Sequence, residues 1–198
     1  MTLNKPFTPT HAALGALLAL TLSTQASAAV ITFDGLTGAT ADPLSAYTED
    51  GFTVTPTLGA WKEAHVFGNP LPSIYVSALG PDTPFGNLSV TAGGSLFTFN
   101  SLDLQAFNSA VGYEIRGSRG GTVLFSSANG QAASPDFKTL TAGGGLAIDT
   151  LTFDISGGPG SFNVDNINLT AVPEPSAYLL LFSGLSALGL MRRRARLI

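Results

Sequence analysis

The sequence predicts a single all-β domain, an antiparallel β-sandwich of the jelly-roll type. Many short runs alternate apolar and polar residues, and turn residues separate them at intervals of about ten residues. The chain of 198 residues contains 23 Gly and 12 Pro, and no stretch of comparable length has helical periodicity. Short strands rich in Thr, Val and Phe are typical of sandwiches; a closed barrel is the alternative.

The runs that fit strands all end at turn residues. They are residues 30–33, 51–55, 61–67, 73–76, 96–99, 102–107, 111–116, 122–127, 151–155 and 162–169. In the run 111–116, Val111, Tyr113 and Ile115 share one face. Residues 117–121 read Gly-Ser-Arg-Gly-Gly, and glycines supply the positive φ angles that a tight hairpin to the run 122–127 needs.

The last predicted strand changes its alternation halfway. Phe162 and Val164 share one parity, whereas Ile167 and Leu169 share the other. One extra residue in a strand shifts every later side chain to the opposite face. We therefore expect a β-bulge at residues 165–166, which would turn all four apolar residues toward the core.

The amino-terminal segment, residues 1–28, is typical of a secretory signal peptide. A basic start is followed by eleven predominantly apolar residues, 12–22, and then by a polar stretch with the small residues Ala26 and Ala28. The apolar run is too short to span a bilayer, which needs about 20 residues. We expect signal peptidase to cleave after Ala28, with the general secretion machinery as the export route.

The carboxyl-terminal segment, residues 172–198, has three parts in order. Pro173, Glu174 and Pro175 form a stiff tripeptide, and sixteen uncharged residues, 176–191, follow it. The chain then carries a cluster of four arginines, Arg192, Arg193, Arg194 and Arg196. Arginines beside a short apolar helix favour the cytoplasmic side, so we expect a transmembrane helix that leaves the domain outside.

These three parts resemble the PEP-CTERM sorting signal, also named an ice-binding-protein C-terminal domain. The resemblance covers residues 172–198. It implies a Gram-negative bacterial protein associated with exopolysaccharide, held in the inner membrane and processed near Pro-Glu-Pro by an exosortase. Surface display or release into the extracellular matrix would follow.

Between the two ends, residues 29–171 form the predicted domain. The chain has a net charge of −4, and this central part holds four basic residues against twelve acidic ones. Because a nucleic-acid partner needs a basic face, nucleic-acid binding is excluded. The absence of cysteine rules out disulfides, thiolate metal sites and a cysteine nucleophile.

The domain offers little catalytic chemistry. His65 is the only histidine after residue 28, and no G-x-S-x-G motif occurs. A glycosidase would need two carboxyl groups facing each other across a cleft, and the sequence pairs none of Glu49, Asp50, Glu63 and Glu114. We therefore predict a non-catalytic protein without a cofactor, apart from a candidate structural calcium ion discussed below.

A candidate carbohydrate contact lies in the run 61–67. Strand alternation would put Trp61, Glu63, His65 and Phe67 on one side. If this row is exposed, the indole can stack on a sugar ring while Glu63 and His65 bind hydroxyls. If it is buried, the two aromatic residues belong to the core.

The stretches VITFDGL and SFNVDNINLT resemble the first and last strands of PEP-CTERM proteins with lectin-like jelly-roll domains. In such domains the two strands are neighbours and hold calcium, which implies Asp34 and Asp165 as candidate ligands. In the alternative, Asp34 closes the turn before Gly35, and Asp165 and Asn166 hydrogen-bond their own backbone.

Three functions remain open at this stage. The leading one is a non-catalytic envelope or matrix protein. The second is a cell-surface carbohydrate-binding module, and the third is a polysaccharide-active enzyme.

Overall fold

The computed structural model describes residues 26–78, 83–157, 159–173 and the three residues 183, 184 and 186. Residues 1–25 of the predicted signal peptide (1–28), the arginine cluster and all but three residues of the predicted apolar helix 176–191 lie outside the described residues. Within the described part the chain forms strands, namely β1 (Ala28–Ile31), β2 (Tyr47–Glu49), β3 (Phe52–Leu58), β4 (Lys62–Ala64), β5 (Ser73–Ala78), β6 (Thr83–Thr91), β7 (Phe97–Ala106), β8 (Val111–Arg119), β9 (Thr122–Gln131), β10 (Lys138–Leu140), β11 (Thr150–Gly157) and β12 (Gly160–Ala171).

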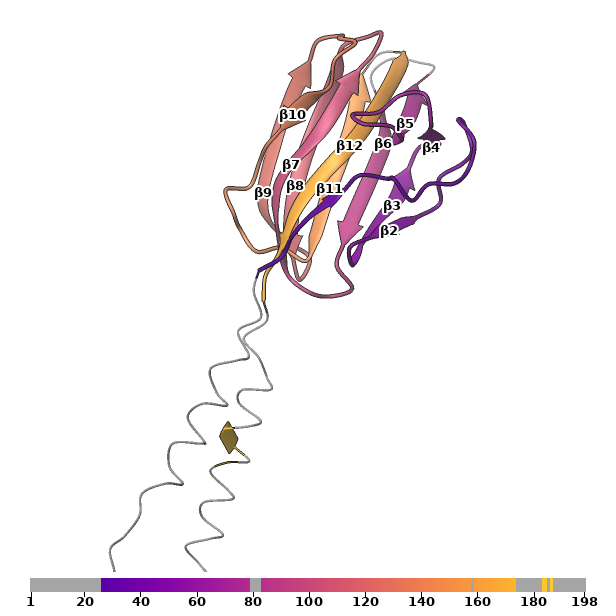
Figure 1. Cartoon of the computed structure of the whole chain (residues 1–198). Helices are drawn as coiled ribbons and strands as arrows, with labels where there is room; N and C mark the ends of the chain where they lie inside the picture. Colours follow the sequence, from indigo (N-terminus) through magenta and orange to yellow (C-terminus); the bar gives the residue numbers. More distant parts are fainter. Residues whose placement is uncertain (1–25, 79–82, 158, 174–182, 185, 187–198) are drawn as a thin grey trace, which may run out of the picture.

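The strands form two antiparallel sheets packed face to face, so the predicted β-sandwich is confirmed (Figure 1). Sheet A has the order β10-β7-β12-β5-β4, with β1 also paired to β12, and sheet B has the order β2-β3-β6-β11-β8-β9. From β5 to β12 the chain winds between the sheets, giving the quartets β5-β12-β7-β10 and β6-β11-β8-β9. This is the strand order of a jelly roll rather than of a closed barrel.

Alternation along the strands places one face of each sheet in a shared core. In β11, Leu151, Phe153 and Ile155 are buried between the sheets, and the residues between them face outward. Phe162, Val164, Ile167 and Leu169 of β12 belong to the same core. No helix among the described residues is long and apolar enough to cross a membrane.

The predicted bulge in β12 is confirmed. The register between β12 and β7 shifts between Asp165 and Asn168, and Asn166 has a φ of 46°. At this point β12 also changes its neighbour on the other edge: residues 160–164 pair with β5, and residues 167–170 pair with β1. The bulge is therefore the place where three strands meet β12.

The hairpin between β8 and β9 also follows the prediction. Gly120 and Gly121 lie between the two strands with φ angles of 57° and 78°. A two-residue turn with positive φ angles at both residues has a backbone twist that matches the right-handed twist of the two strands.

Three strands were missed by the sequence analysis: β2, β6 and β10. β6 is central in sheet B, between β3 and β11, yet it begins Thr-Pro-Phe-Gly-Asn, a sequence typical of a turn. The structure explains Gly86: a Cβ there would lie 2.9 Å from Cγ1 of Val76 and 3.2 Å from Cζ2 of Trp61. Glycine is thus required by sheet packing rather than by a turn.

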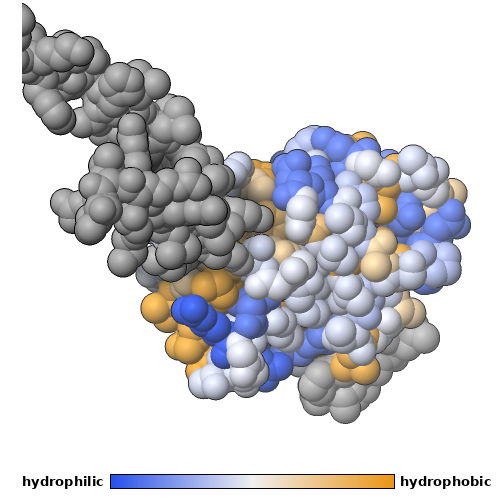
Figure 2. Space-filling view, turned by 90° about the horizontal axis from the view of Figure 1, so that it is seen from below, coloured by the Kyte–Doolittle hydropathy of each residue, from blue (hydrophilic) through white to orange (hydrophobic). Residues whose placement is uncertain are grey.

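Both ends of the folded body lie at the same end of the sandwich (Figure 1). The Ala171 N–H donates to the Ser27 carbonyl at 2.9 Å, and the Val172 N–H donates to the Leu96 carbonyl at 2.8 Å. Figure 2 views the body from this end, where hydrophobic residues form small patches among hydrophilic ones. Ala28, the residue expected to precede signal cleavage, is paired with Thr170.

Candidate functional site

Trp61 is in the core, with 1% of its surface exposed. Its indole Nε1 donates to the Leu58 carbonyl at 3.0 Å, so its polar atom is also occupied inside the protein. The strand in this region is shorter than the predicted run 61–67. β4 covers only Lys62–Ala64, so the strand alternation does not extend from Trp61 to Phe67. Trp61 therefore belongs to the core, as in the second of the two alternatives, and its indole cannot stack on a saccharide, whereas Phe67 is 43% exposed.

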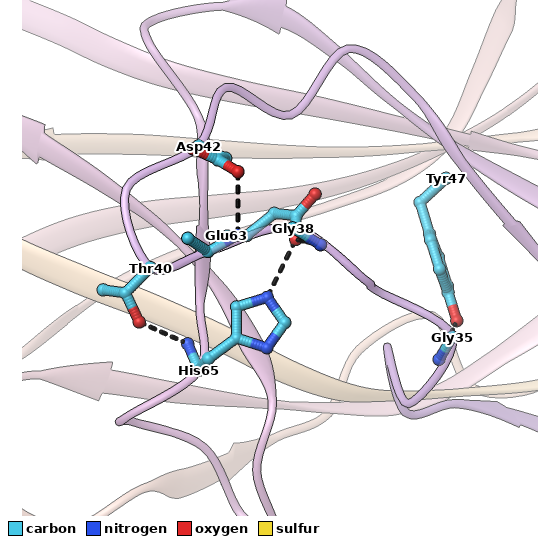
Figure 3. Close-up of polar contacts among 8 residues, drawn as sticks. Gly35, Gly38, Thr40, Asp42, Tyr47, Glu63 and His65 are labelled. Carbon is cyan, nitrogen blue, oxygen red and sulfur yellow. Dashed lines mark hydrogen bonds and ion pairs between the residues drawn. The ribbon is translucent and has the colours of Figure 1, made fainter.

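Glu63 and His65 connect β4 to the loop that precedes β2 (Figure 3). The Glu63 carboxylate lies 2.8 Å from His65 Nε2 and accepts the Gly38 N–H at 3.0 Å. The His65 N–H donates to the Thr40 hydroxyl at 3.0 Å. These contacts hold the loop against β4, so the polar atoms predicted to bind hydroxyls already serve the fold.

Asp34 is exposed in a turn. The Leu36 N–H donates to the Phe33 carbonyl at 2.9 Å, and Asp34 and Gly35 occupy the middle of this turn. Asp165, in contrast, is completely buried and accepts the Asn166 N–H at 2.8 Å and the Asn69 N–H at 2.6 Å. Asp34 thus lies in the turn before Gly35, and Asp165 accepts backbone N–H groups. These are the roles expected in the alternative to calcium binding.

Burial raises the pKa of the Asp165 carboxyl to about 6. This pKa is the net result of several contributions. The hydrogen bonds from the Asn69 and Asn166 N–H groups lower it, and the nearby charges of Asp103 and Asp34 raise it. Asp34 is therefore close enough to Asp165 for their charges to interact. Within the described residues, however, no group of three or more His, Cys, Asp or Glu side chains is placed to hold a metal ion.

Calcium binding stays a prediction, and it has a direct test. If Asp34 and Asp165 bind calcium, a chelator should lower the melting temperature and excess calcium should restore it, because a ligand of the native state alone stabilises that state. Melting curves of the protein with and without chelator measure this. An unchanged melting temperature would remove calcium from the description of this site.

The described residues contain a cleft of about 420 Å³ on the outer face of sheet A. Two loops form its walls: residues 65–72, between β4 and β5, and residues 132–137, between β9 and β10. The lining residues are Val66, Phe67, Gly68, Asn69, Leu71, Gln105, Pro135, Asp136 and Phe137. None of them carries a positive charge.

The floor of the cleft is the Gln105 side chain, which pairs with the amide of Asn163. Gln105 on β7 faces Asn163 on β12, and the two are register partners. Asn163 Nδ2 donates to Gln105 Oε1 at 2.6 Å, and Gln105 Nε2 donates to the Pro135 carbonyl of one wall. Both residues are at least nine-tenths buried, and Asn163 Oδ1 has no hydrogen-bond partner among the described residues.

The other wall is fastened to the β12 bulge. Asn69 donates its N–H to Asp165, and its carbonyl accepts a hydrogen bond from Asn166 Nδ2. The same Asn166 amide donates to Asp103 at 3.0 Å, and Asp103 in turn accepts the Thr139 hydroxyl of β10 at 2.7 Å. The bulge therefore positions the cleft wall as well as the core residues of β12.

The walls expose apolar and aromatic side chains. Val66, Phe67 and Leu71 have 61%, 43% and 51% of their surfaces exposed. Phe67 contacts Phe107 with a centroid distance of 5.9 Å. The loops beside the cleft thus expose apolar and aromatic side chains, while the surface inside the cleft is mostly polar and has the Gln105 amide at its floor.

The sequence does not predict this cleft. Gln105 and Asn163 are polar residues in predicted strands, which is a usable signal for a polar outer face. Their pairing depends on β7 and β12 being neighbours, however, and nearly 60 residues separate them in sequence. The wall loop 65–72 was partly predicted as strand, so its position over the sheet could not be inferred.

Comparisons with known proteins identify the carboxyl-terminal segment. Residues 171–195 match the PEP-CTERM protein-sorting motif. No curated protein sequence matched the chain.

Several solved structures are similar to the folded body. The family 32 carbohydrate-binding module of C. perfringens NanJ, in complex with galactose, has a TM-score of 0.47 and 17% identity over 64% of this chain and 98% of its own. A variant of the family 29 module CBM29-2, complexed with mannohexaose, has a TM-score of 0.46 and 13% identity over 75% and 93%. The enzymatically active domain of tailspike protein 4 from bacteriophage CBA120 has a TM-score of 0.38 and 17% identity over 62% and 20%.

The motif match covers the stretch in which the tripeptide, the apolar run and most of the arginine cluster follow one another, directly after the last strand. The chain is a PEP-CTERM sorting domain-containing protein.

Proposed function

We propose that the protein is a non-catalytic component of the cell envelope or extracellular matrix, exported and then sorted through its carboxyl-terminal segment. Residues 176–191 hold it in the inner membrane, and the arginine cluster stays in the cytoplasm. An exosortase processes it near Pro-Glu-Pro, and the folded body then reaches the cell surface or the exopolysaccharide matrix. The observation that carries this proposal is the match of residues 171–195 to the sorting motif.

The position of the motif supports processing after folding. β12 lies between other strands of sheet A and ends at Ala171, and the Val172 N–H still belongs to the body through its bond to Leu96. Pro173 has no N–H to continue the sheet. Pro-Glu-Pro therefore follows directly after the last residues that bond to the folded body, and cleavage there leaves the described strands intact.

The surroundings of the acidic residues support a non-catalytic role. Glu49 accepts hydrogen bonds from Thr32 and from the Phe33 N–H, Glu63 binds His65, and Glu114 lies 3.5 Å from Arg116. A catalytic carboxylate would face a cleft with a second carboxyl group opposite it. Glu49 and Glu63 instead hold neighbouring segments together. Glu114 and Asp154 do line a second pocket, of about 340 Å³, but both carboxylates pair with Arg116, as in a structural ion-pair network.

Replacement of Pro173, Glu174 and Pro175 by alanine tests the sorting proposal. We expect the variant to remain unprocessed and membrane-held, because the protease loses its recognition segment while the apolar anchor remains. Immunoblots of membrane and external fractions from the producing bacterium measure this, with Pro159→Ala at an exposed turn as the matched control. Normal processing of the triple variant, or a carboxyl-terminal tag found outside the inner membrane, would contradict the proposal.

Carbohydrate binding at the cell surface is the second candidate function. The cleft on sheet A favours it, because sugar sites combine apolar walls with a few fixed polar groups, and this cleft falls in the size range of small-molecule sites, about 300–1,000 Å³. This function is compatible with the first, since a matrix protein can be retained by binding the matrix polymer.

A further inference from the structure

We propose that the cleft between the loops 65–72 and 132–137 binds an uncharged saccharide and discriminates against polyanionic polysaccharides. This inference rests on the second candidate function and names its site and ligand class. Phe67 and Phe137 supply apolar contact area, Gln105 supplies the hydroxyl-binding amide, and Asp136 supplies the negative charge at the wall.

The walls match the apolar faces of a sugar ring. A pyranose exposes C–H groups on its faces and hydroxyls around its edge, so it favours an aromatic or aliphatic wall beside polar groups. Phe67 remains 43% exposed even though it packs against Phe107. Its exposed surface is therefore available to a ligand, unlike that of Trp61.

The floor matches the hydroxyl edge. The Gln105 side chain is held in place from both ends, by Asn163 and by the Pro135 carbonyl, so its orientation is set before a ligand arrives. Fixed polar groups bind with a smaller loss of conformational entropy than mobile ones. Asn163 itself is 2% exposed and is not among the lining residues, so Gln105 is the floor residue that a ligand meets.

The charges select against anionic polymers. Asp136 lines the cleft, and Asp103 and Asp165 lie in the network that fastens one of its walls. No lysine or arginine is among the lining residues. A uronate chain would meet electrostatic repulsion here, strongest at low ionic strength, whereas an uncharged chain would not.

The test uses the full-length protein in detergent micelles, passed over immobilised dextran, laminarin, galactomannan and alginate. We expect retention on at least one of the three uncharged polymers and not on alginate. Phe67→Ser should weaken that retention about tenfold or more, as expected when a central aromatic contact is lost. Leu58→Ser is the matched control, because Leu58 is 47% exposed on β3 of the other sheet, and it should leave retention unchanged.

Asp136→Lys gives an independent arm of the same experiment. It replaces the charge that repels uronates, so the variant should gain retention on alginate while keeping its binding to the uncharged polymer. The fluorescence of Trp61, the sole tryptophan and a buried one, verifies that each variant is folded.

Three outcomes would overturn the inference. These are no retention on any uncharged polymer, equal retention of the wild type and Phe67→Ser, or wild-type retention on alginate as strong as on the uncharged polymers. Processing at Pro-Glu-Pro is assayed separately in the same variants. Normal processing with lost binding would contradict the cleft inference and leave the sorting proposal unaffected. Failed processing would contradict the sorting proposal, and the retention data would still test the cleft.

Discussion

The protein is expected to lose stability as the pH rises from about 4 to above 6, because Asp165 is buried within the fold. Its pKa is raised from 3.8 to about 6 in the folded protein, chiefly by burial. Below the unfolded pKa the carboxyl is protonated in both states, and the full stabilisation is present. Between the two pKa values only the unfolded chain releases the proton, so the free energy of unfolding falls as the pH rises, by roughly 3 kcal/mol in total.

Asp165→Asn should remove this pH dependence. The amide stays neutral at every pH and can accept one of the two N–H bonds, so the variant should be less stable than the wild type at acidic pH but comparable or better at pH values well above 6. Melting temperatures between pH 4 and 8 measure the crossover. Asp136→Asn is the control: Asp136 is exposed in the loop 132–137, so it should leave the wild-type slope unchanged.

Asp149, a second acidic group with a shifted pKa, does not contribute to the pH dependence between pH 4 and 6. The pKa of Asp149 is lowered, first by the hydrogen bond from the Gly120 N–H, so its protonation affects stability below the ordinary aspartate pKa. A wild-type melting temperature that stays flat from pH 4 to 8, or a slope of the same size in Asp165→Asn, would mean that Asp165 is not the buried acid described here.

The sequence predicted the strands whose pattern is purely local. β8, β11 and β12 have regular alternation, and the bulge in β12 was visible because four large apolar side chains must all reach one core. β6 was not predictable in this way. Its glycine is dictated by Val76 and Trp61 in distant segments, and only the three-dimensional packing distinguishes that glycine from a turn residue.

The functional residues also differ in whether a local sequence pattern can predict them. The sorting motif is a linear signal read by other proteins, so the order of its three parts suffices to identify it. The cleft is lined by three separate segments, and the position of Gln105 at its floor depends on strand pairing. The run 61–67 shows the opposite error: alternation was extended along seven residues, whereas the strand covers only Lys62–Ala64, and Trp61, just before it, is buried.

Loss of the Trp61 side chain is expected to be among the most destabilising single changes in the body. Trp61→Ala removes a side chain that is 1% exposed, leaves a cavity between the sheets, and deprives the Leu58 carbonyl of its donor. Such changes cost about 3–5 kcal/mol, which is a large part of a typical free energy of unfolding of about 5–15 kcal/mol. Urea unfolding followed by circular dichroism measures the loss, since the variant has no tryptophan fluorescence. Val123→Ala at a 56% exposed position is the control and should change the unfolding free energy by less than about 1 kcal/mol.

Gly86 should be energetically coupled to Trp61 because the two meet between the sheets. Gly86→Ala alone places a Cβ 2.9 Å from Val76 and 3.2 Å from Trp61, and overpacking of this kind costs about 1–3 kcal/mol. Trp61→Phe creates space at the same contact, so the double variant Gly86→Ala with Trp61→Phe should be more stable than the sum of the two single losses predicts. Strict additivity in this double-mutant cycle would show that the added methyl group is accommodated elsewhere. Packing against the Trp61 indole would then not explain why residue 86 is a glycine.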